Sequence, residues 1–401
     1  MQRKRILIIN YHYPPIISGG TQRVYNFKKY LSCYGIDVSI ITTNSYGSLE
    51  DDAENHIYRF PDWGCDYVSN SKHSKIARFL FRAFRRVQVY LGLITDGKYY
   101  WKKKVLKGIK EVVDEYEYDA VVASYPSAAN LEIGEFIHEK YKVPLIVDYR
   151  DGITFDPFPS RGGTFFFSRY RMASLEKRMG EKAILQLTVN QEMNEYYSQK
   201  YPSVKTILIP NGFDDEEEIG ASPIKLQDGC NILYTGGIAK SRMVYSFDLL
   251  AQVLDKMFTA AEGVFFTFVG EYDERELALF SRYKNVFVFP KVDRKIILAT
   301  QKCADALLLI SGPKGGTSGK LYEYMFAQRP IVNIGSKTGV AELINGKQFG
   351  ITIDPSESEK IVSVINQIKL GNMQIDYPYL EKYTRKYQSK QFSEVLHEVL
   401  G

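Results

Sequence analysis

Cysteine is scarce in this sequence of 401 residues, and the four cysteines lie far apart. They are Cys33, Cys65, Cys230 and Cys303, and no two of them form a Cys-x-x-Cys pair. Disulfide-stabilised small domains and structural zinc sites need closely spaced ligands, so the spacing excludes both classes. We therefore expect free thiols, a reducing compartment and no metal site.

The sequence also lacks a long hydrophobic run. Its N-terminus begins with basic residues up to Arg5, and the apolar run that follows ends at Asn10. That run is too short for the core of a signal peptide, and no segment approaches the roughly 20 apolar residues of a spanning helix. We expect a cytoplasmic protein, and any contact with the inner face of the plasma membrane is expected to be peripheral.

A strong excess of charge of either sign is missing. The chain has 52 basic and 47 acidic residues, for a net charge of +5. Such a balance does not indicate nucleic-acid binding, and it is compatible with anionic ligands or a membrane surface. Histidine is scarce as well, and of the five only His12 lies in a loop directly after a predicted strand.

Apolar runs of strand length alternate with helical patterns along the whole chain. This alternation predicts an α/β protein with parallel sheets that are covered by helices on both faces. The predicted strands are 5–10, 37–43, 119–124, 144–148, 184–189 and 205–209 in the first half, and 232–235, 264–269, 286–289, 305–310 and 331–334 in the second.

A chain of this length is expected to form about two domains. The turn sequence Pro210-Asn211-Gly212 separates the two series of strands. We place the boundary near residue 213, with an N-terminal domain over 1–213 and a C-terminal domain over 214–401. One arrangement left open is that the last helix, about 380–400, packs back on the N-terminal domain.

The most informative segment is 311–335, in which a predicted strand ends in a glycine-rich loop and a helix begins. Glycine allows close approach of the backbone, and a helix N-terminus offers free N–H groups, so this arrangement suits a diphosphate. Lys320 adds a positive charge, and Glu323 stands where a carboxylate can accept hydrogen bonds from a ribose. A flexible loop with a surface lysine and glutamate is the other interpretation of the same pattern. The candidate ligand-binding residues here are Gly316, Thr317, Ser318, Gly319 and Leu321.

The stretch GTSGKLYEYMFAQRPIV resembles the donor-binding segment of glycosyltransferase family 4, the retaining GT-B enzymes. Glu323 matches the glutamate that holds the donor ribose in that family. Other segments match in the family's order: the opening strand and Gly-Gly loop, the Asn211-Gly212-x-Asp214 turn, the ILYTGG strand end and the VFPKVD segment.

The resemblance implies a GT-B fold, in which two Rossmann-like doubly wound domains face each other across a cleft. The N-terminal domain would bind the acceptor, and the C-terminal domain would bind the nucleotide sugar. It further implies retention at the anomeric carbon, no cofactor and no metal, since the nucleotide sugar is a substrate. The donor contacts implied elsewhere in the chain are Gly19, Gly20, Gly236, Gly237, the basic residues Lys240 and Arg242, and Val292.

The run VDYRDGI follows a predicted strand of the N-terminal domain. Related polysaccharide enzymes have a similar Asp-x-Arg-Asp run there. We therefore assign Asp151 a catalytic role together with Lys320 and Glu323, and we assign Arg150 and Tyr125 to the acceptor. An Arg–Asp pair that only holds the loop is the alternative.

Segment 72–94 is basic and aromatic, with six Lys or Arg and no acidic residue between Lys72 and Arg86. On a helix, Ile76, Leu80 and Phe84 share a face, and the basic residues lie largely opposite. This pattern is typical of a helix that lies on an anionic membrane surface. An ordinary helix packed on the domain with a solvated basic face is the other interpretation.

Taken together, the sequence predicts a glycosyltransferase that moves a sugar from a UDP-sugar, with GDP-mannose as the next candidate. The acceptor would be a saccharide or a polyprenyl-linked saccharide in bacterial polysaccharide or lipopolysaccharide biosynthesis. Two alternatives stay open: a nucleotide-sugar epimerase, and a non-catalytic partner subunit, because Gly315 stands where the family often has a second glutamate. The sequence does not favour a dehydrogenase, because Ser18-Gly19-Gly20 does not form a Gly-x-Gly-x-x-Gly loop.

Overall fold

The computed structural model describes residues 3–16, 19–155, 166–238, 245–311, 319–336, 339–346, 349–373, 375 and 380–401. The chain forms two compact units. The first comprises Met1–Asn211 and Arg385–Gly401, and the second comprises Gly212–Thr384. The division therefore falls two residues before the boundary that we placed at 213, and the C-terminal helix belongs to the first unit.

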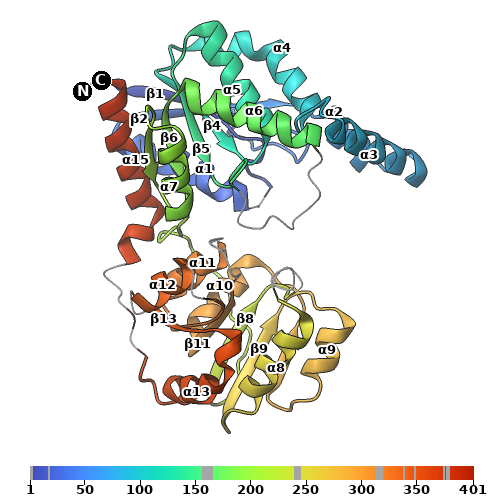
Figure 1. Cartoon of the computed structure of the whole chain (residues 1–401), viewed down its shortest axis with the longest axis vertical. Coiled ribbons are helices and arrows are strands. Elements are labelled where there is room, and N and C mark those ends of the chain that lie inside the picture. Colours follow the sequence, from blue (N-terminus) through green and yellow to red (C-terminus); the bar gives the residue numbers. More distant parts are fainter. Residues whose placement is uncertain are drawn as a thin grey trace. The chain divides into compact units, whose positions relative to one another are not determined.

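The first unit contains a sheet of seven parallel strands among its described residues, in the order β3-β2-β1-β4-β5-β6-β7 (Figure 1). Strand order reverses at β1, which pairs with β2 on one side and β4 on the other. The strands are β1 (Lys4–Ile9), β2 (Ile36–Thr43), β3 (Ile57–Phe60), β4 (Ala120–Tyr125), β5 (Leu145–Tyr149), β6 (Ala183–Thr188) and β7 (Lys205–Leu208).

Helices cover both faces of this sheet because its strands are apolar on both sides. Leu7 and Ile9 pack into one hydrophobic cluster, and Ile6 and Ile8 pack into the other. The helices are α1 (Gly19–Leu31), α2 (Trp63–Ser69), α3 (Lys75–Tyr90), α4 (Tyr99–Glu115), α5 (Ala128–Tyr141), α6 (Phe166–Lys182), α7 (Gln191–Lys200) and α15 (Arg385–Leu400), with a 3-10 turn at Ser32–Tyr34.

The C-terminal helix α15 packs on α1 of the first unit. The rings of Phe27 and Phe392 lie 5.0 Å apart, and Leu396 is buried in the same cluster. Lys4 donates a hydrogen bond to the carbonyl oxygen of Leu400 at the helix end, at 3.1 Å. The last helix thus packs back on the N-terminal unit, which is the arrangement left open from the sequence.

The second unit repeats the architecture with a sheet of six parallel strands among its described residues, in the order β10-β9-β8-β11-β12-β13. Here the order reverses at β8, between β9 and β11. The strands are β8 (Cys230–Thr235), β9 (Val264–Val269), β10 (Val286–Phe289), β11 (Ala306–Ile310), β12 (Ile331–Ile334) and β13 (Gly350–Ile353).

The two faces of this sheet are covered in the same way. Ile232 and Tyr234 belong to one cluster, and Leu233 between them belongs to the other. The helices are α8 (Phe247–Phe258), α9 (Glu274–Phe280), α10 (Arg294–Cys303), α11 (Gly319–Ala327), α12 (Gly339–Gly346) and α13 (Ile361–Lys369), with 3-10 turns at Pro355–Lys360 and Glu381–Tyr383. Within the part of the chain that the structure describes, no helix has the length and apolar character needed to cross a membrane.

Candidate active site

The second unit contains a cavity of about 650 Å³ beside the strand order reversal at β8. It lies at the carboxyl ends of the strands, where open α/β sheets bind their ligands. The residues that line it are Thr235, Gly236, Gly237, Val269, Gly270, Glu271, Lys291, Val292, Arg294, Ile297, Ile310, Lys320 and Glu323.

Two glycine-containing loops form one wall of this cavity. Gly236 follows β8 with a φ of +90°, a conformation that side chains disfavour, and it donates to the carbonyl oxygen of Val269 at 2.7 Å. A Cβ atom at Gly270 would lie 2.8 Å from the carbonyl carbon of Gly236. Glycine is therefore required for the close approach of the two loops, and their partly accessible backbone faces the cavity.

The ammonium group of Lys320 lies over the first loop. Lys320 is the second residue of α11, and its Nζ donates to the hydroxyl of Tyr234 at 3.0 Å. The same Nζ lies 4.2 Å from the centre of the Tyr234 ring, and a Cβ atom at Gly236 would lie 3.0 Å from it. A positive side chain and the N-terminal end of a helix dipole thus meet over a glycine loop, an arrangement that suits a diphosphate.

Glu323 enters the same cavity from one turn further along α11. Its Oε2 accepts a hydrogen bond from Arg294, and that arginine also donates to both carboxylate oxygens of Glu217, at 2.9 and 3.1 Å. Partial burial lowers the pKa of Arg294, and the two carboxylates outweigh this effect, so that the pKa is raised. Arg294 therefore stays charged and fixes the orientation of the Glu323 carboxylate.

The predicted donor-site residues of the second unit divide into three groups. Gly236, Gly237, Val292, Lys320 and Glu323 line the one cavity. Gly319 opens α11, whereas the side chain of Leu321 is fully buried in the hydrophobic core and does not line the cavity. The others, Lys240, Arg242, Gly316, Thr317 and Ser318, lie outside the described residues.

The sequence interpretation missed Arg294 and Glu217. Arg294 follows the N-cap Asp293 of α10, directly after the VFPKVD segment that carried part of the resemblance. Glu217 belongs to the acidic stretch 214–218, and it is only partly accessible because it holds Arg294. No local pattern signals this pairing, since its partners lie 77 residues apart.

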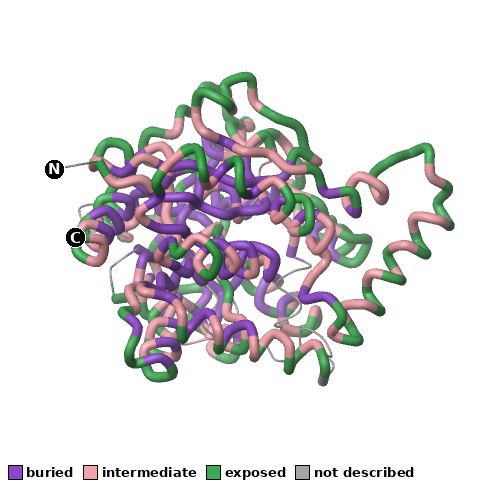
Figure 2. The backbone as a smooth tube through the Cα atoms, turned by 90° about the horizontal axis from the view of Figure 1, so that it is seen from above, coloured by how far each residue is buried: buried purple, intermediate pink, exposed green. Residues whose placement is uncertain are grey.

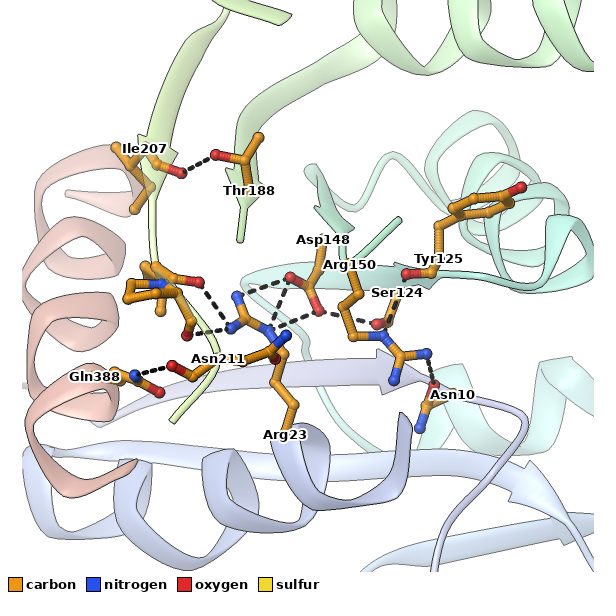
Figure 3. Close-up of polar contacts among 12 residues, drawn as sticks. Asn10, Arg23, Ser124, Tyr125, Asp148, Arg150, Thr188, Ile207, Asn211 and Gln388 are labelled. Atoms are coloured by element: carbon orange, nitrogen blue, oxygen red, sulfur yellow. Dashed lines mark hydrogen bonds and ion pairs between the residues drawn. The ribbon is translucent and has the colours of Figure 1, made fainter. Parts of the chain in front are cut away.

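In the first unit, a buried ion pair ties the strand ends together (Figure 3). Arg23 of α1 contacts the carboxylate of Asp148 at the end of β5, at 3.0 to 3.2 Å, and both side chains are essentially inaccessible. Arg23 also donates to the carbonyl oxygens of Ile209 and Pro210, and Ser124 donates to Asp148 at 2.9 Å. This network braces the loops at the carboxyl edge of the sheet.

Arg150 lies beside this network and joins three loops. Its backbone N–H and its Nε both donate to the carbonyl oxygen of Tyr125, at 3.0 and 3.2 Å, and its Nη2 reaches Asn10 at 3.5 Å (Figure 3). A Cβ atom at Gly20 would lie 2.5 Å from the guanidinium. Burial lowers the pKa of Arg150, and Asp148 acts in the opposite direction.

The predicted N-terminal residues are thus partly assembled within the first unit. Gly20, Tyr125 and Arg150 lie together, and Gly19 begins α1 next to them. Asp151 follows Arg150 and is exposed.

His12, in the loop after β1, belongs to the same edge of the sheet. Its pKa falls from 6.5 to about 4, first through burial and then through the positive charges of Lys98 and Arg150. The imidazole is therefore neutral at physiological pH. Among the residues that the structure describes, no cluster of three or more His, Cys, Asp or Glu is arranged to hold a metal ion.

The two doubly wound units, with parallel sheets of seven and six strands among the described residues, correspond to the two Rossmann-like domains of a GT-B fold. Residues 229–369, which include the cavity, match the family described as glycosyl transferases group 1. The chain is therefore a glycosyltransferase with a GT-B fold.

Solved structures support the same fold over the whole chain. It is similar to α,α-trehalose-phosphate synthase (UDP-forming) from Burkholderia vietnamiensis, with 13% identity, a TM-score of 0.62 and coverage of 100% of this chain and 99% of that one. Anabaena HepE in complex with UDP-glucose gives 13% identity, a TM-score of 0.60 and coverage of 98% and 99%. A glycosyltransferase from Rickettsia africae is similar with 14% identity, a TM-score of 0.59 and coverage of 100% of this chain and 99% of that one. No curated protein sequence matches the chain significantly.

Proposed function

We propose that this protein transfers a sugar from a UDP-sugar to a saccharide or lipid-linked saccharide acceptor. One observation carries the proposal: a glycine loop, an ammonium group and a carboxylate converge on a single cavity of about 650 Å³. That volume lies within the range of small-molecule sites. The diphosphate would rest on Gly236 and Gly237 under Lys320, the ribose on Glu323, and the base near Val292. UDP is favoured because the similar structures described above are UDP-forming or hold UDP-glucose.

The chemistry required of the donor site is stabilisation of a leaving diphosphate. Lys320 is fixed through Tyr234, so a positive charge stands ready before the reaction begins, and the helix dipole of α11 acts in the same direction. Preorganised charges of this kind contribute much of the rate acceleration in enzymes and need no metal. We infer a metal-independent reaction with retention at the anomeric carbon, in which no cofactor takes part.

We infer that the acceptor binds to the first unit, at the carboxyl edge of its sheet. Tyr125 and Arg150 meet there, and a partly buried guanidinium favours an acceptor that carries negative charge. Asp151 would position or deprotonate the acceptor hydroxyl. A saccharide on a polyprenyl diphosphate has the required charge, and this acceptor class favours a role in polysaccharide or lipopolysaccharide assembly at the inner face of the plasma membrane.

The proposal is tested by a thermal-shift panel of UDP-, GDP-, ADP- and dTDP-sugars with the full chain. A ligand at 100 times its Kd stabilises the folded state by about 2.7 kcal/mol, which raises the melting temperature of a unit of this size by roughly 5–10 °C. We expect this shift with UDP-sugars and slow release of UDP without an acceptor. Binding of none of the nucleotides would refute a transferase role.

A further inference from the structure

Helix α3 contacts the first unit through one narrow face. The ring of Phe81 lies 5.5 Å from that of Trp63 and 6.0 Å from that of Tyr100. One turn further on, Arg85 donates to the carbonyl oxygen of Gly97 at 2.7 Å. These contacts fix the rotation of the helix about its own axis, while the rest of α3 projects from its unit in both views (Figures 1 and 2).

The apolar side chains of α3 point away from this contact face. Ile76 is 72% exposed, Phe79 64%, Leu80 59% and Phe84 53%, and no residue of the helix is buried. An amphipathic helix on a globular protein ordinarily turns its apolar face to the core. The interpretation of α3 as an ordinary packed helix is therefore wrong, because here the apolar face is the one that meets solvent.

Neighbouring elements extend the apolar surface. Leu93, in the loop after α3, is 60% exposed, and Phe167 and Tyr170 at the start of α6 are 59% and 73% exposed. The two elements are fastened together, because Arg171 of α6 donates to the carbonyl oxygen of Gly92 at 2.6 Å. We call the apolar residues of α3, Leu93, Phe167 and Tyr170 the α3 surface. Such a group of neighbouring exposed apolar side chains differs from the single, scattered apolar residues that are normal on a protein surface.

The exposed charged side chains of α3 and of the start of α6 are basic. Lys75, Arg82 and Arg86 are exposed along one side of the helix, and Arg169 is exposed on α6. No acidic residue occurs from Lys72 to Thr95. Exposed apolar side chains flanked by these basic residues match an anionic phospholipid bilayer, which has an apolar interior and anionic headgroups at its boundary.

We propose that the α3 surface docks this protein on an anionic phospholipid bilayer, with α3 lying in the plane of the headgroups. The apolar side chains enter the boundary between headgroups and acyl chains, and the flanking arginines reach lipid phosphates. The proposal concerns where the enzyme works, and it does not depend on the chemistry of the donor site.

The test is sedimentation of the full chain with sucrose-loaded vesicles, without nucleotide or acceptor. We expect binding to vesicles with about 30% phosphatidylglycerol, weak binding to pure phosphatidylcholine, and loss of binding at high salt. Each cationic contact contributes roughly fivefold to such binding, so Arg82→Glu/Arg86→Glu is expected to weaken it at least about 25-fold. Phe79→Ser/Phe84→Ser is expected to lower binding to both kinds of vesicle.

The matched control is Arg275→Glu/Arg282→Glu, which makes the same change in net charge at two exposed positions of the second unit. Its affinity for vesicles is expected to lie within about twofold of that of the unaltered chain. Circular dichroism and melting curves are to be recorded for every variant to check that it is folded. Unchanged binding by both α3 variants, or equal loss in the control, would overturn the proposal. A dimer in sedimentation velocity that Phe79→Ser/Phe84→Ser dissociates would also overturn it, since a second copy would then cover the surface.

Discussion

Replacing Glu323 by glutamine tests the role of its carboxylate with almost no change in shape. One oxygen of Glu323 is held by Arg294, which leaves the other oxygen for the ribose hydroxyls in the cavity. Hydrogen bonds to a charged acceptor contribute about 1.5–3 kcal/mol each, against about 0.5–1.5 kcal/mol for neutral pairs. For two ribose contacts the expected loss is about 2–3 kcal/mol, so the Kd for UDP should rise roughly 30–150-fold.

Glu217→Gln is the matched control for this change. Glu217 holds the same arginine through two hydrogen bonds but does not line the cavity. Either substitution weakens a partly exposed ion pair, in which Arg294 is 32% accessible, and costs about 0.5–1 kcal/mol of stability. Only Glu323→Gln removes a ligand contact, so Glu217→Gln should change the Kd by less than about fivefold.

The assay is calorimetric titration of UDP into each protein at one fixed salt concentration. The reasoning predicts a large difference in Kd between the two variants and nearly equal melting temperatures. Equal losses of affinity in both would refute it, because Glu323 would then act only by holding Arg294 in place.

Three further outcomes follow from the described contacts. Lys320→Met should lower the rate of UDP-sugar hydrolysis about 10²–10³-fold, because the leaving diphosphate loses its nearest cation; initial-rate assays measure this. Asp148→Ala should destabilise the first unit by about 3–5 kcal/mol in denaturant titrations, because Arg23 is left buried without its counter-charge. The lowered pKa of His12 means that the unfolded chain binds a proton between about pH 6.5 and 4 that the folded chain does not bind. The contribution of His12 to the free energy of unfolding should therefore be fully present above pH 6.5 and be lost toward pH 4. His12→Gln should reduce this pH dependence in melting curves taken across that range.

Each of these outcomes can also fail in a defined way. A Lys320→Met protein that hydrolyses the donor at the full rate would remove the lysine from the reaction. An Asp148→Ala protein as stable as the parent would show that the buried network does not brace the sheet, and an unchanged pH slope in His12→Gln would assign that slope to other groups.

Much of the fold was predictable because its central strands are short, apolar on both faces and separated by helices. Two edge strands, β7 and β10, were predicted because the runs KTIL and VFVF are mostly apolar. The other two, β3 and β13, were missed because IYRF contains an arginine and GITI begins with glycine and contains a threonine. A short edge strand that is only partly apolar resembles a loop in sequence. The C-terminal helix carried no local signal for its partner, because its contact with Phe27 joins opposite ends of the chain.

The candidate site was likewise predictable only where its residues lie in short local segments. Gly236, Lys320 and Glu323 were predictable from short segments, because a strand, a glycine turn and a helix N-terminus are adjacent in the sequence. Arg294 was not, because its partners are 77 and 29 residues away and only the folded sheet brings them together. The side chain of Leu321 lies in the hydrophobic core, because helical periodicity turns the residue after Lys320 away from the cavity.

The most direct test of the account is a crystal structure of the protein with UDP bound. We expect the diphosphate within hydrogen-bonding distance of the Gly236–Gly237 loop and of Nζ of Lys320, with the ribose hydroxyls on the carboxylate of Glu323. UDP bound anywhere else in the chain, with this cavity filled only by water, would contradict it.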